Sequence, residues 1–413
     1  MTATLIIPLT LALLQQSAPT SAAAALQTGS WRAWLDCPGG ELPFELALTQ
    51  RGKDWTGWIA NGAEHVKIPR VTWDGTELIL DITDYDSTIR AKTSKDGARL
   101  DGTWRKRAGA DRWAELPFHA TVGPADRFPH AAGIASAAMA TIAGRWSVKF
   151  ASEEDPAVGV FEAHNEGVVT GTFLTTTGDY RYLAGVFDGE RLQLSAFDGA
   201  HAFLFNARLQ ADGALAGDFW SRDAFHDTWT ATKDPKAELP DAFTLTKRTD
   251  NYDLAKMAFP DLEGKSRTLA DPAFSGKAKI IEVFGSWCPN CHDASNYLAD
   301  LYRRMHGRGL SVVGLAFELT GDLKRDTEQV KTFAALHKVE YPLLIAGVSD
   351  REKASAALPM LDKLRAYPTL IVLDRDGKVR AVYTGFSGPA TGDEYKAFQI
   401  KFESVIEELL AQP

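Results

Sequence analysis

Residues 279–291 read KIIEVFGSWCPNC, and this stretch decides the fold of the C-terminal part of the chain. Its first half, Lys279–Phe284, is a short and mostly apolar run of the kind that forms a buried strand. Apolar residues with helical spacing follow over His292–Met305. The two cysteines, Cys288 and Cys291, are therefore predicted to lie where a strand ends and a helix begins.

Cysteines at this spacing and in this position favour thiol chemistry. The thiolate is the reactive form of cysteine, and the unpaired N–H groups and positive dipole end of a helix N-terminus stabilise it. Two cysteines on one helical turn can also close into a disulfide, so that the second can resolve a mixed disulfide made by the first. Pro289 suits the first turn, where its missing N–H removes no hydrogen bond.

Two other interpretations of the cysteine pair are half of a zinc site and a pair of inert core residues. A tetrahedral zinc site needs two more ligands, and the remaining cysteine, Cys37, lies in another part of the chain. A strand-to-helix junction after Trp287 is also a poor place to bury two inert cysteines. We therefore expect redox chemistry at Cys288 and Cys291, with no metal and no cofactor.

Length and composition narrow the class of protein. At roughly 100–200 residues per domain, a chain of 413 residues suggests two to four domains. A net charge of -9 offers no basic surface, which argues against nucleic acid as a partner. Three cysteines are too few for a scaffold held together by disulfides.

The N-terminus has the features of a signal peptide. The apolar run Leu5–Leu14 is too short for a membrane-spanning helix, and Ala22–Ala25 offers the small residues of a cleavage site. No Lys or Arg precedes the run, so a disordered Ala-rich tail on a cytoplasmic protein is the alternative. We predict that residues 1–25 direct export to the periplasm or another extracytoplasmic space, and that the mature chain has no membrane span.

The region before the cysteine pair contains an internal repeat. Gly29-Ser30-Trp31 returns as Gly144-Arg145-Trp146, about 115 positions later, and Trp113 has its counterpart in Trp229. Further matches occur in the same order at nearly the same offset. Because this period is longer than that of solenoid repeats, we infer the duplication of a whole small domain.

Each copy has the pattern of antiparallel β-structure. Apolar and polar residues alternate, as in Glu77–Ile82, and Asp-Gly pairs suited to tight hairpins separate such runs. We expect about six short strands per copy, forming a small sandwich or barrel. The predicted units are β repeat 1 at 26–121, a linker rich in Ala, Gly and Pro at 122–141, and β repeat 2 at 142–247.

The pattern changes to alternating strands and helices after the second repeat, which predicts an α/β domain at residues 252–413. The expected strands cover 279–284, 310–317, 341–345, 369–374 and 379–383, and the expected helices cover 292–305, 327–337, 352–364 and 398–410.

This C-terminal region resembles the TlpA-like branch of the thioredoxin superfamily, the extracytoplasmic thiol–disulfide oxidoreductases. The resemblance covers about two-fifths of the chain and rests on the segment 285–291, on Tyr367-Pro368-Thr369 and on the additional strand and helix between them. It implies a thioredoxin-like fold. It also implies that Cys288 attacks and that Cys291 resolves the mixed disulfide.

The resemblance implies roles for further residues. Pro368 matches a cis-proline that faces the disulfide, with an ordinary trans proline as the alternative. Glu282 stands where thioredoxins carry a buried Asp that helps to move the proton of the resolving cysteine. A buried carboxylate there would have a raised pKa and could serve as a general base. The alternative is that Glu282 reaches an exposed edge or pairs with a lysine such as Lys279.

Four other side chains carry weaker expectations. Trp287 is expected to shield the disulfide and to offer an apolar contact to a partner, with simple packing as the alternative. His292 could raise the reactivity of Cys291 or be a solvated residue of the first turn. Glu318 follows a predicted strand and could face the site. Cys37 is expected to be a small buried side chain, unless it is a free thiol or a target of the redox pair.

The sequence as a whole predicts an exported protein-disulfide reductase, with a disulfide-containing protein as substrate and an unidentified thiol as electron donor. A peroxiredoxin-like thiol peroxidase is one alternative, although Gly285 stands where such enzymes need a Thr. In a second alternative, the β repeats bind a ligand or a partner and carry the redox domain as an appendage. The histidines of the repeats are scattered and form no catalytic or metal-binding pattern.

Overall fold

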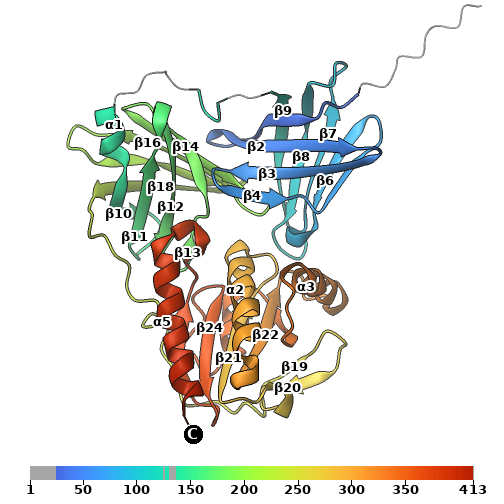
Figure 1. The fold of residues 1–413 in the computed structure, drawn as a ribbon, viewed down its shortest axis with the longest axis vertical. Coiled ribbons are helices and arrows are strands. Elements are labelled where there is room, and N and C mark those ends of the chain that lie inside the picture. The colour runs from blue at the N-terminus through green and yellow to red at the C-terminus, as the bar shows by residue number, and fades with distance from the viewer. Residues whose placement is uncertain (1–24, 124–125, 130–135, 413) are drawn as a thin grey trace, which may run out of the picture.

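The computed structural model describes residues 25–123, 126–129 and 136–412. All but the last residue of the predicted signal peptide lies outside the described residues, as does part of the predicted linker. Figure 1 shows two β-barrels next to each other, with the C-terminal α/β domain against both of them. Within the described ranges, no helix is long and apolar enough to cross a membrane.

The first β-sheet closes on itself to form a barrel, barrel 1. Eight strands make the ring, in which successive strands pair antiparallel, β9 pairs with β1, and the short β4 is added to β3. The strands are β1 (Gly29–Cys37), β2 (Gly40–Arg51), β3 (Asp54–Asn61), β4 (Glu64–Lys67), β5 (Arg70–Trp73), β6 (Glu77–Ile82), β7 (Ser87–Thr93), β8 (Arg99–Arg107) and β9 (Trp113–Val122).

The second sheet, barrel 2, repeats this order strand for strand, which confirms the predicted pair of duplicated antiparallel β domains and selects the barrel over the sandwich. Its strands are β10 (Gly144–Phe150), β11 (Ala157–Ala163), β12 (Val168–Thr175), β13 (Gly178–Asp179), β14 (Leu183–Phe187), β15 (Arg191–Phe197), β16 (Ala202–Leu209), β17 (Leu215–Ser221) and β18 (Phe225–Lys233). The expectation of about six strands per copy is wrong. Strands as short as β4 and β13 are too brief to show an alternating pattern.

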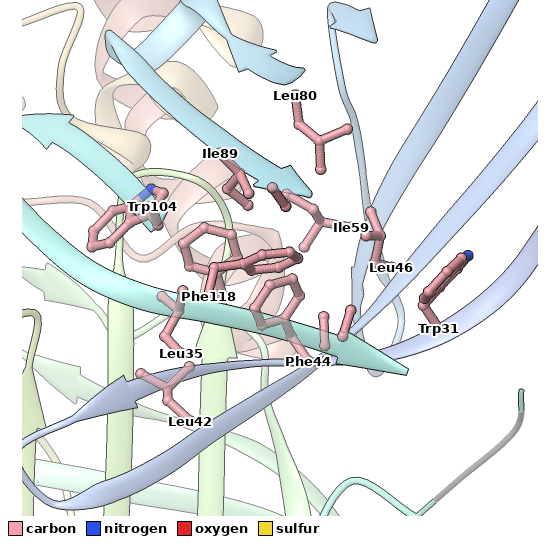
Figure 2. Packing of buried hydrophobic residues seen from close by; sticks show 14 of the residues in the cluster. Trp31, Leu35, Leu42, Phe44, Leu46, Ile59, Leu80, Ile89, Trp104 and Phe118 are labelled. Atoms are coloured by element: carbon pink, nitrogen blue, oxygen red, sulfur yellow. The ribbon is translucent and has the colours of Figure 1, made fainter. Parts of the chain in front are cut away.

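Large side chains fill the barrel interiors. Figure 2 shows inward-pointing residues of barrel 1, among them Trp31, Phe44, Trp104 and Phe118, packed against one another. An eight-stranded barrel is just wide enough to be filled in this way. The Trp104 indole N–H donates to the Ser87 hydroxyl at 2.8 Å, so its polar atom is satisfied inside the core. Trp31 and Trp104 are thus core residues of barrel 1.

The segment before barrel 2 is more ordered than a linker. Residues Ser136–Ile142 form helix α1, and Met139 and Ile142 are buried in the core of barrel 2. The Trp146 indole N–H donates to the carbonyl of Ile142 at 2.9 Å. Helix α1 therefore packs as part of barrel 2, because its apolar side chains cover core residues there.

The C-terminal domain has a five-stranded mixed sheet with the order β23-β22-β21-β24-β25. The central strand β21 is parallel to β22 and antiparallel to β24. The elements are the hairpin β19 (Ala258–Pro260) and β20 (Ser266–Thr268), then β21 (Ala278–Phe284), α2 (Pro289–Met305), β22 (Leu310–Glu318), α3 (Leu323–His337), β23 (Leu343–Val348), α4 (Arg351–Ala356), β24 (Thr369–Asp374), β25 (Val379–Thr384) and α5 (Asp393–Leu410).

Two apolar clusters cover the two faces of this sheet. One joins α2, α3 and α5 to the sheet, and the other includes α4 and the segment around the β19–β20 hairpin. Helix α4 ends at Ala356, short of the predicted end at residue 364, because Pro359 disfavours helical backbone just before it. Phe243, which precedes the predicted domain, also packs on Tyr383 and Phe402 of this domain.

A single arginine connects all three units. Arg181, between β13 and β14 of barrel 2, is 6% exposed. Its guanidinium binds Glu64 of barrel 1 at 2.9 Å and also pairs with Asp293 on α2. The C-terminal domain makes a separate contact with barrel 1, where Arg325 of α3 pairs with Asp86. Apolar packing joins the two barrels as well, since Phe197 of barrel 2 packs on Phe44 of barrel 1. The three units are thus held together by polar contacts and by this apolar packing.

We expect Arg181→Gln to lower the free energy of the first unfolding transition by about 3–5 kcal/mol, because it leaves buried carboxylates unpaired. Urea unfolding of the full chain, followed by tryptophan fluorescence, measures this. Arg70→Gln is the matched control, since the Arg70 side chain is 67% exposed against 8% for Arg181. Arg70→Gln should lower the free energy of unfolding by at most about 1 kcal/mol. Equal losses in the two variants would contradict a structural role for Arg181.

Candidate active site

The junction between β21 and α2 places both cysteines. Helix α2 begins at Pro289, and Cys288 is its N-cap residue with extended backbone. The Cys288 Sγ accepts a hydrogen bond from the backbone N–H of Cys291 at 3.3 Å. The structure therefore brings the two thiols together on the first turn of the helix.

The two thiols have different surroundings. Both are free in this structure, but Cys288 is 7% exposed and borders a cavity, whereas Cys291 is fully buried behind it. Burial, followed by the interaction with Cys288, raises the pKa of Cys291 well above its ordinary value. Cys291 can therefore become a thiolate near neutral pH only if a nearby base takes its proton.

Tyr367 and Pro368 lie against the outer cysteine. The Tyr367–Pro368 peptide bond is cis, and the Cys288 Sγ–H donates to the carbonyl of Tyr367 at 3.5 Å. Trp287 packs edge-on against the Tyr367 ring, and its indole N–H donates to the carbonyl of Phe317 at 2.9 Å. These contacts hold Trp287 beside Cys288, at the wall of the cavity.

Glu282 lies in the interior beneath the cysteines. It is fully buried, and its carboxylate accepts hydrogen bonds from Ser295 at 2.5 Å and from Tyr341 at 2.8 Å. Burial raises the pKa of Glu282 to about 7, and its charge is close enough to raise the pKa of Cys291. The alternative of an edge position or a pair with Lys279 is wrong, because the Lys279 ammonium donates to the carbonyl of Leu269.

A second buried carboxylate supports the active-site loop. Glu318 accepts hydrogen bonds from the backbone N–H of Ser286 at 2.8 Å and from its hydroxyl at 2.6 Å. Burial raises the pKa of Glu318 to about 7. The sequence placed Glu318 after a strand but did not indicate its partner, since the contact joins residues on two different strand ends.

His292 is buried, so the expectation of a solvated first-turn residue is wrong. Its Nε2 lies 2.8 Å from the carbonyl oxygen of Ser286, and its Nδ1 lies 2.8 Å from the Nε2 of His337. A carbonyl can only accept, so the Nε2 of His292 carries the proton and the Nδ1 accepts from His337. Tyr85 of barrel 1 covers the ring of His292 at 4.6 Å.

Cys37 is buried in barrel 1, and burial raises the pKa of its thiol. It packs within the apolar core there, in agreement with the expectation of a small buried side chain. The structure gives it no part in the site around Cys288.

The two barrels complete the surroundings of the cysteines. A cavity of about 350 Å³ opens in front of Cys288 and is lined by residues of all three units, including Lys106 of barrel 1 and Arg222 of barrel 2. Asn290, which lies between the cysteines, donates to the carbonyl of Asp179 of barrel 2 at 3.3 Å. Such residues could not be found from sequence, because they come from segments far apart in the chain. Across the described residues, no group of three or more His, Cys, Asp or Glu side chains is arranged to hold a metal.

The order of the sheet and the position of the cysteine pair define the C-terminal part as a thioredoxin-like redox domain. In a comparison with known families, residues 235–398 match the family model Redoxin. The match covers the same C-terminal region in which the sequence resembles TlpA-like proteins.

Proteins similar to this domain include several named thiol-disulfide oxidoreductase. The thiol-disulfide oxidoreductase ResA of Bacillus thuringiensis is 29% identical over 119 residues, which is 29% of this chain and 60% of the relative. ResA of Geobacillus thermodenitrificans is 26% identical over 125 residues, 30% of this chain and 63% of the relative. The chain thus spans about 60% of the length of these relatives. The structure of a thiol:disulfide interchange protein of Chlorobium tepidum is 21% identical, with a TM-score of 0.26, and the match covers 39% of this chain and 98% of that one.

The histidine pair predicts a loss of stability in acid. Burial lowers the pKa of His337 to about 4 and that of His292 well below its ordinary value. A base with a depressed pKa stabilises the fold above its unfolded pKa, about 6.5, and this contribution is lost as the pH falls toward 4. We expect His337→Gln, which can still donate to His292 but cannot gain a proton, to flatten this dependence.

Urea unfolding at a series of pH values from 7 to 4 measures the effect. His65→Gln, at an exposed position of barrel 1, is the control and should follow the wild-type curve. If His337→Gln also follows the wild-type curve, the histidine pair does not titrate with folding.

Proposed function

We propose that this protein is an exported thiol–disulfide oxidoreductase that reduces protein or mixed disulfides with Cys288 and Cys291. The observation that carries the proposal is the unequal pair of thiols, in which Cys288 borders a cavity and Cys291 is buried directly behind it. Such a pair suits one thiol for attack and the other for resolution. The redoxin family match and the names of the ResA relatives support the same activity.

The proposed cycle has two exchange steps. The Cys288 thiolate attacks one sulfur of the substrate disulfide, whose S–S bond breaks, and the other substrate sulfur leaves as a thiolate and takes up a proton. The Cys291 thiolate then attacks the Cys288 Sγ and releases the first substrate sulfur. The enzyme is left with a Cys288–Cys291 disulfide, and an external thiol donor must reduce it before the next turnover.

Glu282 is proposed as the proton acceptor for Cys291. The second step needs a Cys291 thiolate, yet burial opposes that charge. A carboxylate with a pKa of about 7 is half ionised at neutral pH, and Glu282 lies within electrostatic range of Cys291. Trp287 is proposed to shape the site because it lies in the wall next to Cys288, and Pro368 because its cis peptide bond follows Tyr367, whose carbonyl accepts from Cys288.

The protein's cellular location and its domain boundaries also belong to the proposal. The apolar run Leu5–Leu14 supports export by residues 1–25 to the periplasm or another extracytoplasmic space. We retain the division into domains at 26–121, 142–247 and 252–413, supported by the two closed barrels and the five-stranded sheet. The barrels are proposed to be non-catalytic and to govern access to Cys288.

We expect Cys288→Ser to abolish reduction of bis(2-hydroxyethyl) disulfide, because the attacking thiol is gone. Cys291→Ser should accumulate a mixed disulfide between Cys288 and half of the substrate, detectable as added mass in an intact-protein spectrum. Cys37→Ser is the control and should keep the wild-type rate, since Cys37 lies in the core of barrel 1. Rapid consumption of hydrogen peroxide by a protein that does not reduce disulfides would favour a peroxidase instead.

We expect Glu282→Gln to slow the resolving step by about 10- to 100-fold without unfolding the domain. In the wild type the carboxylate is the active form, so the single-turnover rate should rise with pH around 7, and the variant should lack this rise. Tyr341→Phe is a second variant for this test, because it keeps the Glu282 carboxylate but changes its surroundings. It removes a hydrogen bond that favours the charged carboxylate and should shift the rise to higher pH. An unchanged pH profile in both variants would exclude Glu282 as the base.

A further inference from the structure

The cavity in front of Cys288 has an excess of positive charge. Among the described residues that line it, the basic ones are Lys106, Arg222, Arg351 and Arg365, and the acidic one is Asp179. The carboxylate of Asp179 already accepts hydrogen bonds from two backbone N–H groups, each at 2.7 Å. Arg365 also pairs with Asp362, but one carboxylate in the lining carries too little charge to balance the other three basic side chains.

Lys106 is the most unusual of these side chains. It is 5% exposed and lies at the end of β8, where the alternation that buries Trp104 also turns Lys106 inward. In the part of the chain that the structure describes, its ammonium has no hydrogen-bond or ion-pair partner. A buried charge without a partner is costly, so an anion in the cavity would compensate it.

Arg222 is a second basic side chain at this cavity, and it comes from barrel 2. It follows β17 with a φ of 58°, which is uncommon for a residue with a side chain. Its side chain is half-buried at the same cavity, and over the described ranges the guanidinium also lacks an ion-pair partner. Burial and then the nearby charge of Arg222 lower the pKa of Lys106, whereas the more distant carboxylates of Asp198 and Asp86 act in the opposite direction. Asp198 and Asp86 already pair with Arg181 and Arg107. Two unpaired cations near each other indicate a site for a group with negative charge.

The barrels also limit the size of what can reach Cys288. The turn at Gly178 packs on Asn290 so closely that a Cβ on Gly178 would lie 2.2 Å from the side-chain nitrogen of Asn290. Barrel 2 thus covers the Asn290 side of the site, and Cys288 itself is only 7% exposed. A wider cavity of about 1130 Å³ adjoins it and shares Thr175 and Tyr180 as lining residues.

We propose that the cavity binds a small disulfide that carries carboxylate groups, and that Lys106 and Arg222 bind those carboxylates. This inference rests on the proposed function and names its substrate class. A cavity of about 350 Å³ is within the range of roughly 300–1,000 Å³ found for small-molecule sites. The carboxylates neutralise the two buried cations and bring the substrate S–S bond to the Cys288 Sγ.

The reaction is the exchange already described, applied to a small substrate. Cys288 forms a mixed disulfide with one half of the substrate, and the other half leaves as a thiol. Cys291 then releases the first half as a second thiol, so that the substrate disulfide is reduced as the Cys288–Cys291 disulfide forms. A single turnover of the pre-reduced protein needs no external donor.

The test compares single-turnover rates of the pre-reduced full chain with three small disulfides. These are oxidised glutathione, which is anionic, bis(2-hydroxyethyl) disulfide, which is uncharged, and cystamine, which is cationic. Each rate is divided by the rate of dithiothreitol with the same disulfide, which removes intrinsic reactivity. We expect the anionic disulfide to react fastest on this scale and the cationic one slowest.

Variants then test whether the two cations cause the preference for the anionic disulfide. Lys106→Gln and Arg222→Gln should each lower the ratio of anionic to uncharged rates by about 10-fold, as expected for the loss of a charged hydrogen bond. Lys106→Arg should retain most of the ratio because it retains the charge. Lys92→Gln, which removes an exposed charge from β7 of the same barrel, should leave the ratio unchanged. Using a ratio cancels any effect of the variants on the thiolate itself.

Three outcomes separate the inference from the proposed function. If the ratio is the same in wild type and in both Gln variants, the cations do not bind the substrate and the inference fails while the oxidoreductase activity stands. If insulin is reduced as fast as oxidised glutathione, the cavity does not limit substrate size and the inference also fails. If no disulfide oxidises the cysteine pair, the proposed function itself is wrong.

Discussion

The guanidinium of Arg181 is the contact on which the arrangement of the three units depends. It extends from barrel 2 and binds a carboxylate of barrel 1 and another on α2 of the redox domain. Burying one charge in this way is costly, and the carboxylates of Glu64 and Asp293 offset that cost. The consequence reaches the active site, because Asp293 lies two residues after Cys291 and the neighbouring turn of barrel 2 covers Asn290.

The candidate active site therefore has acidic side chains on one side of the cysteines and basic side chains on the other. Behind the cysteines lie buried carboxylates, Glu282 and Glu318, whose pKa values are raised toward neutrality by burial. In front of them lies a cavity whose unpaired charges, on Lys106 and Arg222, are positive. A raised carboxylate pKa suits the handling of a thiol proton, whereas buried cations suit the binding of an anionic ligand. The redox domain supplies the acidic side, and the barrels supply the basic side.

The features that could be predicted from sequence are local or periodic. The Cys288–Cys291 spacing, Pro289 at the start of a helix and the alternation of strands and helices are visible over a few residues. The duplication is visible because the same tripeptide and the same tryptophans recur at one offset. By contrast, His292 next to a helix start looked as if it could be solvated, and the structure buries it between His337 and Tyr85. The number of strands was also underestimated, since a strand of two residues carries no periodic signal.

The sequence by itself determined the cysteine pair at a helix start, the thioredoxin-like class of the C-terminal domain and the presence of two copies of a β domain. These follow from short-range physics, namely helix-end electrostatics, strand alternation and turn-forming residues. Only the tertiary structure decided what surrounds Cys288. Lys106 and Cys288 are far apart along the chain, and their meeting at one cavity depends on barrel closure and on the burial of Arg181 between the units. Contacts of this kind arise from packing of whole domains, and no local pattern in the chain encodes them.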